Sequence, residues 1–405
     1  MTPALKGFLL LAAVKVVVGF GGLLLAVAFV TWLERRQAGF HQDRLGPNRV
    51  GPFGLFQPIA DGIKNFIKEE LVPADADKFL FLMAPAMVFI PALLLFAVIP
   101  FAAPLPVSFD FELPIVGRFA YDGLMPVMVA DLPVGLLFVL AVSSIGVYGI
   151  VLAGWASNSK YSFLGGLRSS AQMVSYEVAL GLSVISVFII AGDVTLTGVV
   201  ENQQRSIWYI FPLALGFALF VVSALAETNR LPFDLPEAES ELVFGYHTEY
   251  SAMKFAMFFL GEYAALITMS ALMATLFFGG WDIPFTTWDE SQPSLLKTVI
   301  TFGVFAAKTF FFIFMYIWIR WSLPRFRYDQ LMALGWKVLL PAALGYLMLL
   351  AGAVWALERL GVQQGLLYGF ILFVINLPAI YALFWVLDSG ALVFGQQLQK
   401  RMMNE

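Results

Sequence analysis

The amino-acid sequence predicts an all-α fold, a polytopic membrane helix bundle with eight to nine transmembrane helices. Of the 405 residues, 60% are hydrophobic and only 13% are charged, and the mean hydropathy is +0.82. Soluble domains average roughly 45–50% apolar and about 25% charged residues, because polar groups must cover their surface. The apolar residues also form runs of the roughly 20 residues that a helix needs to cross a bilayer.

These runs place the spans along the chain. The first is longer than the roughly 7–15 apolar residues of a signal peptide, so we expect it to be retained. We expect residues 1–388 to form a single transmembrane bundle domain, with an extra ninth span at its end, and residues 389–405 to form a cytoplasmic tail. The candidate spans are residues 7–33, 79–103, 124–154, 170–192, 207–226, 252–279, 296–320, 336–357 and 365–387.

The distribution of Lys and Arg between the loops predicts the orientation of the bundle, because these residues are enriched on the cytoplasmic side. Most of them fall on one side if the loops 34–78 and 227–251 lie inside. The other side then receives only Lys6, Arg118, Arg205, Lys297 and Arg359. The sequence therefore predicts an N-terminus outside and two long, charged loops inside.

The residue types exclude several kinds of redox centre in this chain. There is no cysteine, so a disulfide, a thiolate-bound iron–sulfur cluster and a cysteine-based zinc site are impossible. The two histidines, His41 and His247, fall in the inner loops, which excludes a bis-histidine haem within the bilayer. We expect no metal site, and any electron-transfer centre must belong to another chain.

The first inner loop contains turn-forming Gly-Pro pairs at 46–47 and 51–52, followed by an apolar pattern at three- and four-residue steps. This pattern predicts an amphipathic helix over residues 53–68. Such a helix either lies in the membrane interface or packs on the inner ends of the bundle, and the two placements are compatible. It would also form one wall of a lateral opening for a lipid-like substrate.

The second inner loop is rich in carboxylates interleaved with apolar residues. A run of charges is usually a solvated face, but Phe233, Leu235 and Leu242 indicate that parts of this loop are buried. Crowded carboxylates at the ends of membrane helices raise one another's pKa and can then hold and pass on protons. Arg230 is the nearby counter-charge. The acids are Glu227, Asp234, Glu237, Glu239, Glu241 and Glu249.

Several ionisable residues fall within the predicted spans, where each costs at least about 2.5–3.5 kcal/mol. Glu177, Asp131 and Glu262 lie two to three turns into their spans, and Lys308 lies midway along its own. A structural ion pair, for example between Lys308 and a glutamate, is one interpretation. A polar path from the inner face, formed by Glu177 and Glu262 with the loop acids, explains more of them and suits proton uptake from the inside.

Several long motifs resemble those of a known family. They are ERR at 34–36, RLGPNRVGP at 44–52, GWASNSKYS at 154–162, SYE at 175–177, PFDLPEAESELV at 232–243 and GYHTEY at 245–250. Together they resemble the quinone-channel membrane subunit of respiratory complex I, which is called the H subunit in bacterial proton-translocating NADH:quinone oxidoreductase. The resemblance extends, in order, from about residue 34 to about residue 336.

The resemblance implies a membrane protein that supplies the quinone entry channel and part of a carboxylate proton path, without a redox centre of its own. By position, it implies the quinone-channel residues Arg35, Arg36, Phe53, Gln57, Asp61 and Arg230. It implies the proton-path residues Glu177, Glu227, Asp234, Glu237, Glu239, Glu241, Glu249 and Glu262.

The resemblance also implies the surroundings of the chain. The location would be a bacterial cytoplasmic (inner) membrane, and the substrate ubiquinone or menaquinone, with no cofactor bound to this chain. The partners would be a hydrophilic arm carrying iron–sulfur clusters, antiporter-like membrane subunits and the lipid bilayer, with no nucleic acid.

The chain departs from the family pattern at two places. Some relatives have an acid in the third span where this chain has Ser143 and Ser144, so Asp131 or water must serve there or the path differs. The ninth span occurs in only part of the family.

Three other functions fit the composition. They are a homologous subunit of a membrane-bound hydrogenase, an independent ion-coupled transporter and a membrane anchor. A transporter would often show repeated halves, and none is seen. An anchor gains nothing from buried Glu177 and Glu262.

Overall fold

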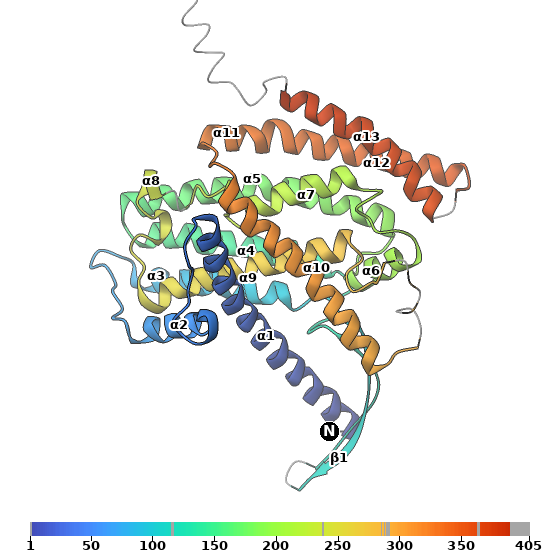
Figure 1. Cartoon of the computed structure of the whole chain (residues 1–405), viewed down its shortest axis with the longest axis horizontal. Coiled ribbons are helices and arrows are strands. Elements are labelled where there is room, and N and C mark those ends of the chain that lie inside the picture. Colours follow the sequence, from blue (N-terminus) through green and yellow to red (C-terminus); the bar gives the residue numbers. More distant parts are fainter. Residues whose placement is uncertain are drawn as a thin grey trace, which may run out of the picture.

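The computed structural model describes residues 2–388 except 115–116, 237–238, 285, 287, 289–291 and 363–364. Glu237 and the predicted tail at 389–405 lie outside the described residues. Within them, eight helical segments are long and apolar enough to cross a membrane. This confirms the predicted all-α, polytopic membrane bundle. The arrangement of the helices is shown in Figure 1.

The eight segments follow the predicted order of spans. In chain order they are α1 (Pro3–His41), α3 (Lys78–Phe96), α4 (Gly135–Ala156), α5 (Lys160–Ala191), α9 (Ala252–Phe277), α10 (Leu295–Ser322), Tyr328–Arg359 and Leu366–Trp385. The seventh segment combines α11 (Tyr328–Ala333), the π-helical η3 (Leu334–Leu339) and α12 (Leu340–Arg359). The eighth is most of α13 (Leu366–Asp388), at the place of the predicted extra span.

The span predicted at 207–226 is shorter than expected. Helix α7 covers only Ala214–Glu227, and a short helix α6 (Leu196–Arg205) lies before it. Turns occupy the residues between the two helices. Pro212 lies two residues before α7, and proline has no N–H to donate within a helix. The apolar run there continues through a turn.

A β-hairpin replaces part of what the sequence predicts as spans. Strand β1 (Ala102–Leu113) pairs antiparallel with β2 (Gly117–Val127). The predicted boundaries at 103 and 124 are therefore wrong, because both residues belong to strands. Hydropathy alone does not distinguish an apolar strand from the start of an apolar helix.

The placement of Asp131 within a span is also wrong. Asp131 lies in the turn before α4, outside any helix. Pro133 follows two residues later, and a proline disfavours helical backbone at the residue before it.

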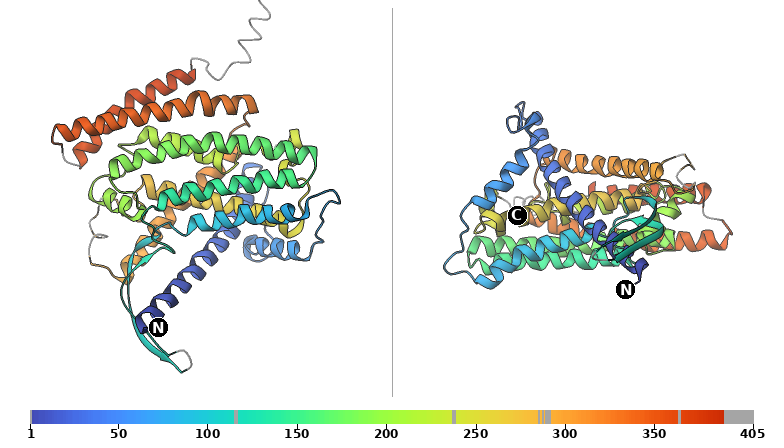
Figure 2. Two further views of the ribbon diagram at one scale, coloured as in Figure 1. Left: turned by 180° about the vertical axis from the view of Figure 1, so that it is seen from behind. Right: turned by 90° about the horizontal axis from the view of Figure 1, so that it is seen from below.

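Two helices cross the bundle obliquely. Helices α5, α7, α12 and α13 run alongside one another, whereas α1 and α10 are steeply inclined to them (Figure 2). The 39 residues of α1 correspond to about 58 Å at 1.5 Å per residue, well above the roughly 30 Å of a hydrocarbon core. Such a helix fits a bilayer only when it tilts. Its N-terminal end leaves the bundle and packs against β2.

The predicted amphipathic helix is present as α2 (Gln57–Ile67). A 3-10 turn, η1 (Pro52–Gly54), precedes it, with Gly51 at φ 73° and Phe53 at φ 53°. Ile59, Ile63 and Phe66 on α2 are all more than half exposed. The second inner loop holds two short helices, α8 (Glu239–Leu242) and η2 (Gly245–His247).

Candidate functional site

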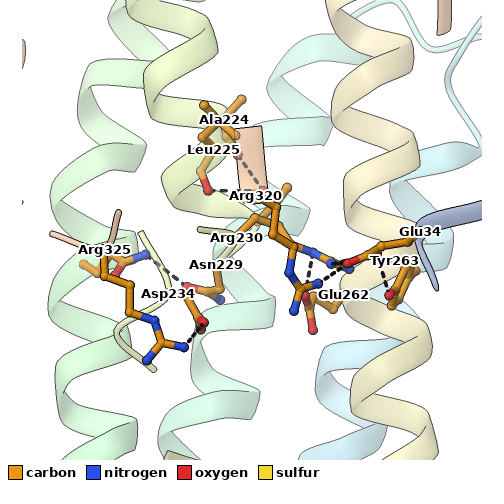
Figure 3. A network of polar contacts seen from close by, with 12 residues as sticks. Glu34, Ala224, Leu225, Asn229, Arg230, Asp234, Glu262, Tyr263, Arg320 and Arg325 are labelled. Atoms are coloured by element: carbon orange, nitrogen blue, oxygen red, sulfur yellow. Dashed lines mark hydrogen bonds and ion pairs between the residues drawn. The ribbon is translucent and has the colours of Figure 1, made fainter. Parts of the chain in front are cut away.

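A buried cluster of charges joins four segments that are distant in the sequence (Figure 3). Arg230, in the loop after α7, donates hydrogen bonds from Nη1 to both carboxylate oxygens of Glu34 on α1 at 3.0 Å. The Tyr263 hydroxyl on α9 donates to the same carboxylate at 2.6 Å. Arg320 on α10 also bonds Glu34. Glu34 is only 4% exposed, so its charge is compensated by protein groups rather than by water.

Glu262 on α9 completes this cluster. Its Oε1 lies 2.7 Å from Nε of Arg230, and the guanidinium of Arg230 lies 4.3 Å from the centre of the Tyr263 ring. Arg230 therefore bridges two carboxylates from different helices. Because α1, α9 and the second inner loop all depend on this one side chain, any change in the charge of Glu262 acts directly on their junction.

The loop that carries Arg230 is held by its apolar residues, as the sequence predicts. Phe233 and Leu235 are 3% and 2% exposed. The N–H of Phe233 donates to the carbonyl of Arg230 at 2.8 Å, and Asn229 takes the left-handed backbone at φ 50°. The turn therefore directs the guanidinium inwards.

Outside the spans, the electrostatics of this loop separate a fixed cation from two groups that burial keeps neutral. Burial lowers the pKa of Arg230, but Glu262 and Glu34 raise it more, so Arg230 stays charged. Burial raises the pKa of Asp234 to about 6, although Arg325, whose Nη2 lies 3.1 Å away, opposes this rise. Burial also lowers the pKa of His247 to about 3, so this imidazole is neutral at pH 7.

The acids predicted within the bundle lie along one side of α9. A cavity of about 70 Å³ is lined by residues of α3, α4, α5, α7, α9 and the second inner loop, among them Ser143, Glu227, Asn229, Tyr246 and Glu262. Ser144 bonds the carboxylate of Glu177. Glu177 in turn lies close enough to Glu227 for their charges to repel. The structure thus brings Glu262, Glu227 and Glu177 together.

The remaining predicted acids lie apart from this cavity. Glu241 is exposed and pairs with Arg168 at 2.6 Å, and Glu249 is half-buried in the loop. Glu239 begins α8. None of these three belongs to the described lining of the cavity.

Apart from Arg230, the predicted quinone-channel residues gather at the junction of α1, η1 and α2. Arg35 pairs with Asp61, which also accepts from Gln57 at 3.1 Å. Partial burial raises the pKa of Asp61, but its bonds with Arg35 and Gln57 lower it overall. Arg36 donates to the carbonyl of Phe53 at 3.0 Å. This junction lies beside the charged cluster, because Glu34 and Arg35 are neighbours.

Three members of the cluster were not predicted as site residues, namely Glu34, Tyr263 and Arg320. Glu34 has a signal in the sequence, because it is the first charge after the long apolar run of α1. Arg320 has none, since one arginine at an inner helix end is typical of membrane proteins. Its role depends on the crossing of α10 over α1.

Lys308 has acceptors of another kind. Its ammonium donates to the backbone carbonyls of Phe278 at 2.7 Å, Gly280 at 3.0 Å and Asp282 at 2.7 Å. It also lies 4.2 Å from the centre of the Trp208 ring. In the part of the chain that the structure describes, these carbonyls replace the glutamate considered from the sequence.

The described residues contain no group of three or more histidine, aspartate or glutamate side chains that could hold a metal ion. The charged cluster is therefore considered as a site for protons and for an organic substrate.

Comparison with known proteins agrees with the motifs and the site. A family model described as NADH dehydrogenase matches residues 14–351. The chain belongs to this NADH dehydrogenase family. A Geobacter sulfurreducens protein, named as the first of two H subunits of NADH-quinone oxidoreductase, is 53% identical over 82% of this chain and 91% of its own length.

Two further relatives are also named as H subunits of NADH-quinone oxidoreductase. The Koribacter versatilis protein is 50% identical over 85% of this chain and 97% of its own length. The Rhodospirillum rubrum protein is 51% identical over 82% and 90%. The predicted family is therefore confirmed, and the chain is a multi-pass membrane subunit of an NADH:quinone oxidoreductase.

Proposed function

We propose that this chain forms the quinone entry channel of its complex and part of the proton path that couples quinone reduction to proton translocation. The observation that carries this proposal is the position of Arg230. It contacts Glu34 next to the α1–α2 junction, and it contacts Glu262 at the wall of the small cavity. One cation thus lies between the predicted quinone residues and the predicted proton acids.

The α1–α2 junction suits the entry of a lipid-like headgroup. Exposed apolar residues of α2 and the exposed ring of Phe53 offer a surface continuous with the bilayer. Arg35, Arg36, Gln57 and Asp61 supply polar groups for the headgroup at the same place. The substrate would be ubiquinone or menaquinone. Electrons would come from an iron–sulfur cluster on a hydrophilic partner protein, since this chain has no cysteine.

The acids within the bundle provide the proton path. A cavity of about 70 Å³ has room for a few waters, since each needs at least about 10–15 Å³ of such volume and two or more polar partners. Water there would join Glu262 to Glu227, and Glu177 would continue the path with Ser144. Ser143 lines the same cavity, so a hydroxyl and water would serve where some relatives have an acid.

Coupling follows from charge. Protonation of Glu262 would remove one of the two carboxylates that hold Arg230, and the arginine would then bind Glu34 alone. A change in the charge near the quinone would act on Arg230 through Glu34 in the opposite direction. Proton binding and quinone chemistry would therefore influence each other through one buried guanidinium.

The Lys and Arg distribution supports a location in the bacterial inner membrane with the N-terminus outside. The charged cluster would then lie toward the cytoplasm, where a hydrophilic arm docks. Antiporter-like membrane subunits would receive the protonation signal on the far side of the path.

The test is Glu262→Gln in the assembled complex. We expect quinone-dependent NADH oxidation and proton uptake to fall at least tenfold, because the amide cannot carry a proton. NADH oxidation with an artificial acceptor, which bypasses the quinone, should stay unchanged. Loss of both activities would indicate failed assembly, and full retention of coupled activity would contradict the proposed path.

A second variant tests the channel separately. Arg36→Ala should raise the KM for quinone several-fold with little change in kcat, because it removes a cation from the entry and no proton acid. A KM equal to that of the unaltered complex would exclude Arg36 from the channel wall.

A further inference from the structure

A large apolar cavity lies between α1 and the rest of the bundle, on the side of the charged cluster toward the α1 N-terminus. Its volume is about 480 Å³. Its walls come from α1, α9, α10 and the residues around the β-hairpin, for example Val18, Phe305, Phe310, Phe101 and Met125. Neither the quinone-channel residues nor the proton acids line it. It therefore needs an explanation of its own.

The dimensions of the cavity limit what fits inside. Its lining residues on α1 extend from Leu11 to Val30, which is about 28 Å of helix at 1.5 Å per residue. A volume of 480 Å³ spread over that length has a mean width of about 5 Å, whereas a helix with its side chains needs about 10–12 Å. A transmembrane helix of a partner protein is too thick, and a single hydrocarbon chain is not.

The inner end of the cavity is closed by the charged cluster. Val30 on α1 precedes Glu34 by one helical turn, and Ile267 on α9 follows Tyr263 by one turn, both lining the cavity. A hydrocarbon chain in the cavity therefore ends at buried ion pairs, and its polar head cannot pass beyond them. The head must lie toward the α1 N-terminus, away from the α1–α2 junction where a quinone headgroup would enter.

One cationic side chain on the wall identifies the kind of head. Lys15 lines the cavity and is half-buried, and Asp131 lies close enough to attract it. An ammonium in the bilayer favours a phosphate near it, whereas a quinone head carries no charge for it to bind. The amine of a zwitterionic phospholipid would in addition be attracted to Asp131.

We infer that this cavity binds one acyl chain of a phospholipid from the leaflet that holds the α1 N-terminus, with the lipid phosphate at Lys15. The lipid fills the space that the tilt of α1 opens between this helix and α9 and α10. This site is separate from the proposed quinone channel, so the experiment below leaves quinone turnover as an independent measurement.

Two glycines provide a matched pair of variants. Gly22 lines the cavity and Gly21 does not. A Cβ added at either would meet no atom within 4 Å, so a phenylalanine can replace each without a backbone clash. Gly22→Phe places a ring in the cavity, and Gly21→Phe places the same ring on the lipid-exposed side of the same helix.

The probe is phosphatidylethanolamine with a diazirine near the end of one acyl chain, added to the purified complex in detergent and activated by light. We expect labelling of α10 peptides around Phe302–Phe310 that falls at least fivefold in Gly22→Phe and not in Gly21→Phe. Lys15→Met should also reduce it several-fold. Unlabelled phospholipid should compete, and a long-tailed quinone should not.

Equal labelling of the two glycine variants would overturn the inference, as would competition by quinone but not by phospholipid. If Gly22→Phe fails to assemble, Ala306→Phe tests the same cavity from α10. Ala306 lines the cavity and its exposed neighbour Ala307, the control, does not.

Discussion

The two halves of α9 each lie beside a buried cation, and the groups that hold the cations differ. In the first half, Arg230 is held by the carboxylates of Glu34 and Glu262. At the far end, Lys308 is held by the backbone carbonyls of Phe278, Gly280 and Asp282. Carboxylates take up protons near neutral pH when they are buried, and carbonyls do not.

This difference separates a part of the bundle that can respond to protons from a part that stays fixed. The ammonium of Lys308 lies at the C-terminal end of a helix, where orphan carbonyls and the helix dipole favour a positive charge. It holds α10 to the end of α9 in every charge state of the acids. Movement driven by protonation is therefore expected around Arg230, with the Lys308 end as its fixed support.

The largest effect is expected from Arg230→Met. Removing one partner of a buried ion pair costs about 3–5 kcal/mol, because the remaining charges are uncompensated. Here two carboxylates lose a partner at once. We expect the assembled complex to be nearly lost on a native gel. Arg49→Met, at an exposed arginine in the first inner loop, is the control and should assemble normally. Normal assembly of Arg230→Met would refute the comparison.

A smaller effect is expected from Lys308→Met. Hydrogen bonds to a charged group contribute about 1.5–3 kcal/mol each, and the freed carbonyls sit at a helix end where water can reach some of them. The thermal midpoint of the complex should fall, while the ratio of protons moved to quinone reduced should not change for the complexes that assemble. A changed ratio would show that the Lys308 end is not merely a fixed support.

The next prediction concerns pH and Asp234. Its pKa is raised from 3.8 to about 6 in the folded chain, so the folded state binds a proton more readily than the unfolded state. Stability from this group is therefore gained as the pH falls from above 6 to about 4, by at most about 3 kcal/mol. Asp234→Asn should remove that gain.

The measurement is the thermal midpoint of both forms at pH 7.5 and pH 5. The variant should compare best with the unaltered complex at pH 7.5 and lose that advantage at pH 5. An equal difference at the two pH values would mean that Asp234 is ionised throughout.

The smallest effect is expected from Glu241→Gln. Its ion pair with Arg168 is partly exposed, and such pairs contribute about 0–1 kcal/mol. Coupled quinone reduction should stay within twofold of normal, in contrast to Glu262→Gln. A loss as large as that of Glu262→Gln would return Glu241 to the proton path and show that the cavity does not mark its limits.

Hydropathy decides whether an apolar segment can cross a bilayer but not its backbone. It predicts α1, α5, α9 and α10, because a backbone in lipid must satisfy its own hydrogen bonds and a helix does so locally. It fails at 102–127, where the apolar residues form two strands, and at Asp131, where a turn precedes α4. Both errors occur where the chain leaves the helices, and there neighbouring segments supply the hydrogen bonds.

By itself, the sequence determined the membrane class, the family and most of the residues at the α1–α2 junction, because these depend on composition and on motifs that are contiguous in the chain. Only the tertiary structure decided that Glu34, Arg230, Glu262 and Arg320 form one cluster. The crossing of α1, α9 and α10 brings these residues together, and no local pattern records that crossing. Where a buried charge finds its partner is a property of helix packing, and packing joins residues that the sequence keeps far apart.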